Sequence, residues 1–211
     1  MPEVDYILDS APVAYAKTDA FSSAGVLAKR AFALIFSRTA AEATAGSTTA
    51  VHAAVADTGV AQTVTTGITN PTCPRNITAT AAGTAGDVKA IQVIITGTNI
   101  NDEVITETLS AFTADSNTSN TVTGNKAFKT VTSIYIPAHD GTGATTAIGY
   151  GEKLGLPWKL SMNTNFRTHL GGTLEGTAAT VATSSSALES NTIDLNSSLN
   201  GSAVVAYFLT V

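Results

Sequence analysis

The sequence is poor in charged residues. Only 13% of its 211 residues are Asp, Glu, Lys or Arg, where about 25% is usual in soluble globular domains. The 11 basic residues are scattered and are outnumbered by 16 acidic ones. Phosphate binding needs clustered Lys and Arg, so we expect no direct nucleic-acid binding.

Cysteine is almost absent. A single residue, Cys73, excludes a disulfide within the chain. It lies between Thr72 and Pro74 without a neighbouring His, which favours an inert small side chain over a reactive thiol. The fold must therefore be held by packing and hydrogen bonds.

Long apolar runs are also lacking. The most apolar early stretch, residues 26–36, contains two basic residues and is far shorter than the roughly 20 residues that span a bilayer. Residues 1–10 carry three acidic residues where a secretory signal carries positive charge. We expect no membrane association and a cytoplasmic site of synthesis.

The polar positions are filled mainly by Thr, Ser, Asn and Gly, and the patterns after residue 60 favour strands. Residues 87–96 are rich in Val and Ile, whose branched side chains suit a pleated sheet. A turn over residues 97–102 and a second strand over 103–109 complete a predicted hairpin. Residues 127–136 form a further predicted strand that ends at Pro137.

The last third continues in the same way. We predict strands over residues 160–167 and 177–183, and a closing pair of strands joined at Asn200-Gly201, a sequence typical of a tight hairpin turn. The final run, 203–211, is so apolar that it should lie inside a sheet or at a contact between subunits. These features predict an all-β fold, an antiparallel β-sandwich or barrel, over residues 61–211.

Residues 1–60 differ from the remainder. They have little core-forming content outside one apolar stretch, and such segments order themselves only against something else. We therefore predict an extended N-terminal arm over residues 1–60. Ser22 and Ser23 are suited to cap a short helix within it that runs through Phe36.

The sequence offers little for catalysis or metal binding. Its three histidines, His52, His139 and His169, are far apart, and none has a second ligand at metal-site spacing. The pair His139-Asp140 is better explained as a loop feature than as a proton relay. We expect no catalytic residues, no metal and no cofactor.

Two polar or aromatic features allow a functional alternative. The turn over residues 99–103 contains oxygen ligands suited to Ca²⁺, although a plain polar turn is favoured. Trp158 would stack on a sugar if it were exposed, but its apolar neighbours favour packing in a core or interface.

Five segments together resemble virion structural proteins of tailed bacteriophages. They are residues 66–78 (TGITNPTCPRNIT), 94–101 (IITGTNIN), 122–128 (VTGNKAF), 152–157 (EKLGLP) and 191–201 (NTIDLNSSLNG). The resemblance covers residues 66–211 and is specific to a lineage more than to an activity. It implies a particle component with a β-sandwich or barrel core and no catalytic residues to carry over.

Within such a particle, the arm and the β-rich remainder together favour a capsid decoration, or cement, protein. Its partners would be the major capsid protein and further copies of itself, as a homotrimer or another closed ring, on the outer capsid surface. Synthesis would take place in the host cytoplasm. The alternatives are a tail or neck protein that forms a tube or connector, and a carbohydrate-binding module that uses Trp158, Tyr150 or Tyr135; an enzyme ranks last.

We expect the functional residues of such a protein to lie at its contacts with neighbouring chains. They belong to the arm, to the single Trp and to the closing strand: Phe21, Leu34, Ile35, Phe36, Trp158, Tyr207, Phe208 and Leu209.

Overall fold

The computed structural model confirms the all-β, antiparallel architecture. Its strands form three sheets in which every pair of neighbours is antiparallel. The structure describes residues 6–8, 13–16, 31–84, 86–114, 119–140 and 143–210.

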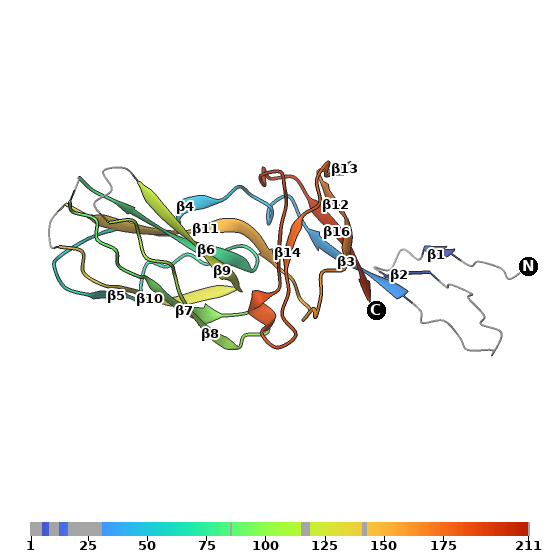
Figure 1. Cartoon of the computed structure of the whole chain (residues 1–211), viewed down its shortest axis with the longest axis horizontal. Helices are drawn as coiled ribbons and strands as arrows, with labels where there is room; N and C mark the ends of the chain where they lie inside the picture. Colours follow the sequence, from blue (N-terminus) through green and yellow to red (C-terminus); the bar gives the residue numbers. More distant parts are fainter. Residues whose placement is uncertain are drawn as a thin grey trace, which may run out of the picture.

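Sheet 1 lies at one end of the body and combines strands from both ends of the chain (Figure 1). In spatial order its strands are β1 (Tyr6–Leu8), β2 (Val13–Ala16), β3 (Ala31–Arg38), β16 (Val204–Thr210), β12 (Asn165–Leu170) and β13 (Thr173–Leu174). Because β16 pairs with both β3 and β12, the closing strand lies inside this sheet, as the sequence predicts.

Sheets 2 and 3 form the rest of the body. Sheet 2 contains β14 (Thr180–Ala182), β15 (Thr192–Asp194), β11 (Thr145–Gly155), β6 (Arg75–Ala82) and β9 (Asn120–Phe128), with β4 (Ser47–Ala56) paired to β11. Sheet 3 contains β5 (Gln62–Val64), β10 (Thr130–Ile136), β7 (Ile94–Thr98) and β8 (Val104–Thr108). A short 3₁₀ turn, η1 (Leu188–Ser190), precedes β15.

Two hydrophobic cores define two lobes. The first core lies between sheets 2 and 3, where Ile77 and Ile148 of one sheet face Ile95 and Ile134 of the other; we call this part the sandwich lobe. The second core lies under sheet 1 and is formed with residues 154, 156, 179, 193, 195 and 199; we call this part the end lobe. Long strand β11 serves both lobes, because it contributes Ile148 to the first core and Leu154 to the second.

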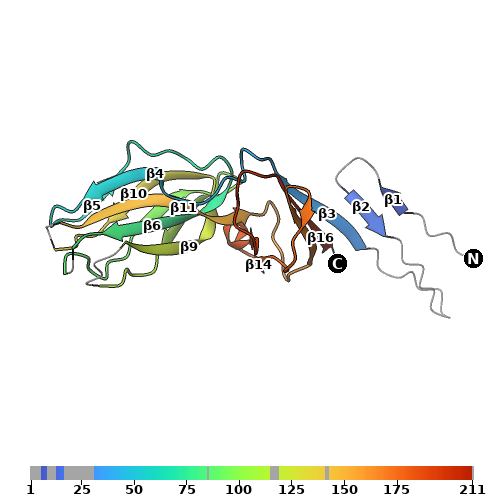
Figure 2. The same ribbon diagram turned by 90° about the horizontal axis from the view of Figure 1, so that it is seen from above.

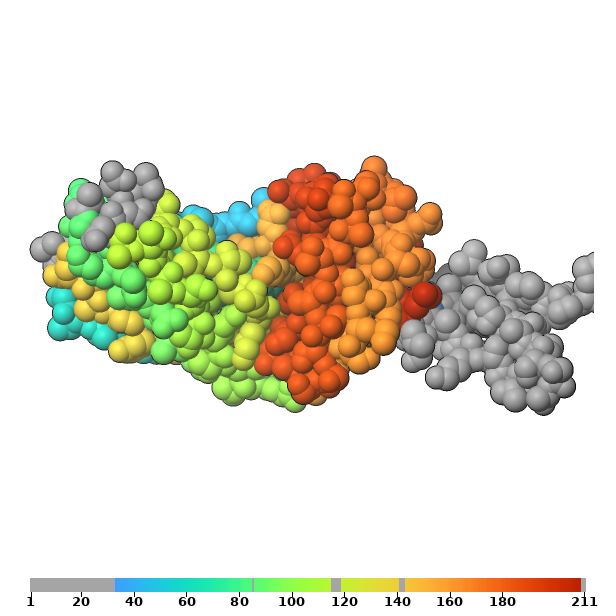
Figure 3. All heavy atoms as spheres, viewed as in Figure 1, coloured from blue at the N-terminus to red at the C-terminus, as the bar shows by residue number. Residues whose placement is uncertain are grey.

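The space-filling view shows the same division. The orange and red residues of the last quarter of the chain gather at the end lobe, beside the green and yellow residues of the sandwich lobe (Figure 3). Seen from above, the two lobes follow one another along the longest axis (Figure 2). The body is therefore elongated, with sheet 1 at one end.

The predicted central hairpin is confirmed. β7 and β8 pair in continuous register from Ile94–Thr108 to Thr98–Val104 around the predicted turn. The first strand starts later than expected, at Ile94. Residues 88–93 form no strand, although Val88 and Val93 are buried in the core. The strand predicted over residues 127–136 is β10, which begins at Thr130 and ends before Pro137 as expected.

Two local predictions are wrong. The helix expected to run through Phe36 is a strand over its last six residues, which belong to β3; residues 22–30 lie outside the described residues. The hairpin expected at Asn200-Gly201 does not form, because β15 pairs with β11 and β14 whereas β16 pairs with β3 and β12. Gly201 has a positive φ of 80° but Asn200 does not, and a type I′ turn requires both.

Two further predicted strands are present with different boundaries. The strands predicted over residues 160–167 and 177–183 are β12, which begins five residues later than expected, and β14. The described residues of the predicted arm, 6–8, 13–16 and 31–60, contribute β1, β2 and β3 to sheet 1 and β4 to sheet 2.

Candidate assembly interface

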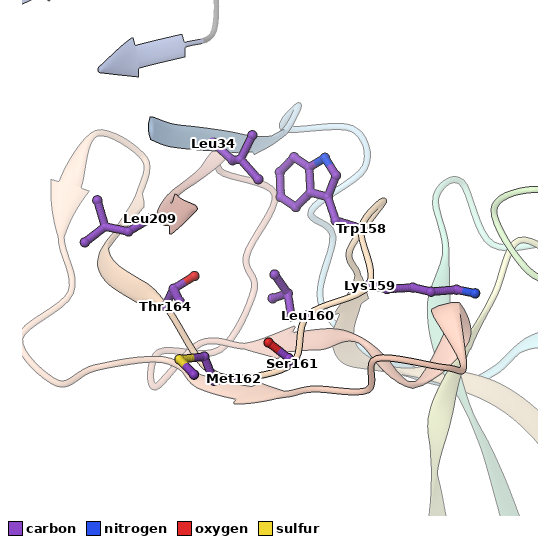
Figure 4. A pocket seen from close by; sticks show the side chains of 8 residues that line it. All are labelled: Leu34, Trp158, Lys159, Leu160, Ser161, Met162, Thr164 and Leu209. Carbon is purple, nitrogen blue, oxygen red and sulfur yellow. The ribbon is translucent and has the colours of Figure 1, made fainter. Parts of the chain in front are cut away.

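An apolar pocket of about 330 Å³ lies in the end lobe, where sheet 1 meets the segment between β11 and β12. It is lined by Leu34, Trp158, Lys159, Leu160, Ser161, Met162, Thr164 and Leu209, and we call it the Trp158 pocket (Figure 4). Leu34 and Leu209 come from neighbouring strands of sheet 1, and the other six residues lie within the segment 158–164. The pocket therefore joins parts of the chain that are more than a hundred residues apart.

Strand register explains why the sheet contributes Leu34 to the pocket. β3 and β16 pair so that Leu34 lies opposite Phe208 and Phe36 lies opposite Ala206. These residues lie on the face of sheet 1 that covers the second core, since side chains two apart on a strand share a face. Phe36 and Phe208 are buried, whereas Leu34 is nearer the end of the sheet and only partly covered.

Trp158 forms the other wall. Its ring meets the ring of Phe208 in an edge-on arrangement, with 6.0 Å between centroids and 63° between planes. Such T-shaped pairs are favoured by the quadrupoles of the two rings. Trp158 is therefore packed against the core on one side and borders the pocket on the other, which confirms the preference for packing over full exposure.

The segment that carries Trp158 is held by Asn191, which is completely buried. The Asn191 Oδ1 atom accepts hydrogen bonds from the amides of Leu160 and Ser184, both at 2.9 Å. Its Nδ2 donates to the carbonyl oxygens of Ser184, Ala187 and Leu188 at 2.8–3.2 Å. One side chain thus joins the pocket segment to the loop before β15.

Charge is nearly absent from the pocket. Among the described residues, Lys159 is the only charged one that lines it, and its side chain points away from the cavity (Figure 4). Met162 and Leu209 are 58% and 40% exposed. Exposed apolar side chains that gather around a hollow are typical of a protein–protein contact, so this is the strongest candidate site among the described residues.

The structure brings three of the predicted interface residues together at this pocket, namely Leu34, Trp158 and Leu209. Phe36 and Phe208 are core residues and are too deeply buried to contact a neighbouring chain themselves. Ile35 and Tyr207 are paired with each other and are partly exposed on the other face of sheet 1.

Phe21 lies outside the described residues. Sequence reasoning missed Leu160, Met162 and Thr164, because residues 160–167 were expected to form one regular strand. Pro157, Ser161 and Asn163 are turn-favouring residues that signalled the irregular segment.

A second apolar cluster lies on the other face of sheet 1. The Tyr207 ring lies 6.1 Å from the ring of Phe166 and 6.1 Å from that of His169. Phe166 is 56% exposed. Both faces of this sheet therefore carry apolar side chains near its end.

The other candidate groups have structural roles. The His139 Nδ1 atom accepts a hydrogen bond from the amide of Lys89 at 3.0 Å, so in the neutral ring Nε2 carries the proton and donates to the Thr146 hydroxyl at 3.1 Å. Burial lowers the pKa of His139 and favours this neutral form. The ring joins three segments, and its contacts do not require Asp140 as a relay partner.

The turn considered for Ca²⁺ is closed by its own side chains. The Asn99 Oδ1 atom accepts hydrogen bonds from the amides of Asn101 and Glu103, at 2.9 and 3.2 Å, and its Nδ2 donates to the Glu103 carboxylate at 2.7 Å. Asp102 takes a positive φ of 63°, and Lys129 binds its carboxylate at 2.8 Å. These contacts favour the polar-turn interpretation. Among the described residues, no group of three or more His, Cys, Asp and Glu side chains is placed to hold a metal ion.

Cys73 is 4% exposed, and its Sγ lies 3.6 Å from the Glu42 carbonyl oxygen. Burial raises the pKa of the Cys73 thiol, although Arg38 and Arg75 act in the opposite direction. A buried thiol with a raised pKa stays protonated near neutral pH, which agrees with the expected inert role.

Arg75 is completely buried beside this thiol. Its Nε donates to the Gly151 carbonyl at 2.9 Å and its Nη1 to the Thr44 carbonyl at 2.8 Å. Its guanidinium lies 4.4 Å from the centroid of the Tyr150 ring. Because Arg75 covers Tyr150 and Trp158 packs on the core, Tyr135 at 40% exposure is the most open of the three rings considered for sugar stacking.

Comparisons with known proteins give no match: no protein-family model, no curated protein and no solved structure is similar to this chain at a significant level. In the described part of the chain, no helix is both long and apolar enough to cross a membrane.

Proposed function

We propose that this chain is a non-enzymatic structural protein of a tailed-bacteriophage particle, and that it decorates the capsid by packing its end lobe against neighbouring chains. The observation that carries the proposal is the apolar, nearly uncharged surface around the Trp158 pocket, with Met162 and Leu209 exposed beside it. The sparse charge of the whole chain also fits a protein that works against neighbours.

The elongated body supports the same proposal. The sandwich lobe has a hydrophobic core of its own, while the Trp158 pocket lies in the end lobe, where sheet 1 is (Figures 1 and 2). Decoration by many copies turns modest individual contacts into a stable shell, because each bound copy raises the effective concentration of the next contact. The partners would be the major capsid protein and further copies of this chain.

One observation favours the alternative of a tail or neck protein. Among the described strands, β1 and β13 are the outer strands of sheet 1, and β13 is only two residues long. If β1 of one copy paired with β13 of the next, the contact would be head-to-tail, and such contacts close into a ring when the rotation between copies allows it. A ring of this kind suits a tube or a connector.

Cryo-electron microscopy of intact particles that carry this chain tests the proposal. Density for the chain on the outer head surface, with its end lobe against capsid subunits, is the expected result. A ring at the neck or along the tail would support the alternative, and absence from the particle would contradict both. Particles assembled with the Leu209→Lys chain should lose occupancy, whereas those with Val104→Lys, a matched change at an exposed position of the sandwich lobe, should keep it.

A further inference from the structure

The outer face of sheet 3 lies open to solvent along the sandwich lobe. Ile95 and Ile134, which are paired, lie in the first core, so the residues next to them in sequence point outward, because successive side chains on a strand alternate between faces. On the outward side Val104 is 76% exposed and Tyr135 is 40% exposed. Sheet 3 forms the lower side of the sandwich lobe in Figure 1, with sheet 2 above it. We call the outward side chains of β5, β10, β7 and β8 the threonine face.

The hydroxyl groups of this face come in neighbouring pairs. Thr96 is paired with Thr106 across β7 and β8, and Thr98 is paired with Thr130 across β7 and β10. The two Oγ1 atoms are 3.4 Å apart in the first pair and 2.7 Å apart in the second. A hydroxyl has one proton and two lone pairs, so one hydrogen bond within a pair leaves a donor and several acceptor positions for a ligand.

The threonine face carries no charged side chain. Lys129 binds the Asp102 carboxylate at 2.8 Å in the turn between β7 and β8, and Lys126 donates to the Thr106 carbonyl oxygen at 2.9 Å. The face therefore offers hydrogen-bonding groups without a cation that would select a phosphate or a carboxylate. A neutral polar ligand matches it best.

The size of the face separates one kind of occupant from another. Sheet 3 has four strands, and β7 and β8 are each five residues long. At about 4.8 Å between strands and about 3.3 Å per residue, the face covers roughly 300 Å². A stable protein–protein interface buries about 800 Å² on each partner, so the threonine face alone is too small for a second copy or another subunit. An extended chain of sugar rings is narrow enough to fit.

We propose that the threonine face binds a neutral polysaccharide chain. The ring of Tyr135, on the inner strand β10, stacks on the apolar C–H side of one sugar ring. The two threonine pairs exchange hydrogen bonds with sugar hydroxyls, which both donate and accept as threonine hydroxyls do. The face lies in the sandwich lobe and the Trp158 pocket in the end lobe, so this inference does not depend on the proposed assembly contact.

Affinity electrophoresis of the full chain tests the inference, in native gels that contain hydroxyethylcellulose, galactomannan, dextran or soluble starch. The wild-type chain should migrate more slowly in at least one of these gels than in a gel without polysaccharide. Tyr135→Ala should weaken this binding by about tenfold or more, since it removes the stacking ring. The double variant Thr96→Val and Thr106→Val replaces two hydroxyls by methyl groups and should weaken it by about fivefold or more.

Phe166→Ala is the matched control, because Phe166 is another exposed aromatic residue, at 56%, but lies in the end lobe. It should bind polysaccharide as the wild-type chain does. All these side chains lie at the surface, so the variants should unfold at urea concentrations close to that of the wild-type chain, and a loss of binding then reports on the face itself.

Three results would overturn the inference. The first is a wild-type chain that migrates equally in all the gels. The second is binding that Tyr135→Ala leaves unchanged, or that Phe166→Ala weakens as much, since the site would then lie elsewhere. The third comes from sedimentation velocity without polysaccharide: dimers of the wild-type chain that Tyr135→Ala dissociates would show that the face is a contact between copies.

Discussion

Removal of the Asn191 side chain should loosen the segment that forms the Trp158 pocket. In Asn191→Ala the amides of Leu160 and Ser184 lose their buried acceptor, and three carbonyl oxygens lose a donor. Each buried amide without a partner costs about 1–3 kcal/mol. The two amides alone therefore predict a loss of about 2–6 kcal/mol, a large part of the roughly 5–15 kcal/mol that stabilises a typical domain.

Urea unfolding followed by tryptophan fluorescence measures this loss directly, because Trp158 is the only Trp and lies on the segment that Asn191 holds. Asn196→Ala is the matched control, since Asn196 is exposed five residues further along the chain. It should change the free energy of unfolding by no more than about 0.5 kcal/mol. If Asn191→Ala were as stable as this control, the assignment of Asn191 as the anchor of the pocket segment would be wrong.

Asn191→Asp makes the same reasoning testable by pH. The new carboxylate still accepts hydrogen bonds from the two amides. However, it has no N–H group to donate to the carbonyl oxygens of Ser184, Ala187 and Leu188, so one of its oxygens faces these oxygens instead. Burial and these oxygens should raise its pKa in the folded state above the unfolded value. The variant should therefore be least stable above the folded pKa and should recover as the pH falls through it. Loss of stability that does not change with pH would contradict this account.

Three further predictions concern the rest of the chain. Phe208→Ala removes a fully buried ring and should cost about 3–5 kcal/mol in urea unfolding. Arg75→Lys keeps the charge but cannot reproduce the donors to Gly151 and Thr44, so thermal unfolding should show a loss of about 2 kcal/mol. Burial acts to raise the pKa of Glu42, but hydrogen bonds from Thr39 and the charge of Arg38 outweigh it and hold the pKa below its usual value. Glu42 should therefore stabilise the fold above the unfolded pKa and lose this effect as the pH falls through the folded pKa, a dependence that Glu42→Gln should remove from unfolding curves recorded at several pH values.

The central hairpin was predictable because its signals are local. The branched residues at the end of the first strand, the Asn-rich turn and the alternation of the second strand act within about fifteen residues of one another. The turn is also stabilised locally, since Asn99 binds backbone groups two and four residues ahead. Tertiary context did not need to override any of these preferences.

β3 shows the opposite case. Residues 31–36 contain Ala and Leu, which favour helix, and their apolar spacing fits a helical stripe only imperfectly. They form a strand because β16, more than 160 residues later, pairs with residues 32–38 of β3. Pairing over such a distance leaves no mark in the local sequence, and the same holds for β16 itself, whose partners could not be read from the Asn200-Gly201 turn signal.

Only part of the candidate site was predictable: Leu34, Trp158 and Leu209 were expected at an interface, whereas Leu160, Met162 and Thr164 were not. The apolar run 203–211 predicts a strand that lies inside a sheet or at a contact between subunits, and among the described residues the structure places one of its faces on a core. Phe208 lies on the covered face, while Tyr207 lies on the other face beside the exposed Phe166. A strand that is apolar on both faces, in a sheet that the described part of the chain covers on one, suits a protein whose second layer belongs to a neighbour. The excess apolar residues of β16 therefore support assembly independently of the pocket, and they predict that Tyr207→Lys, like Leu209→Lys, weakens association more than it weakens the fold.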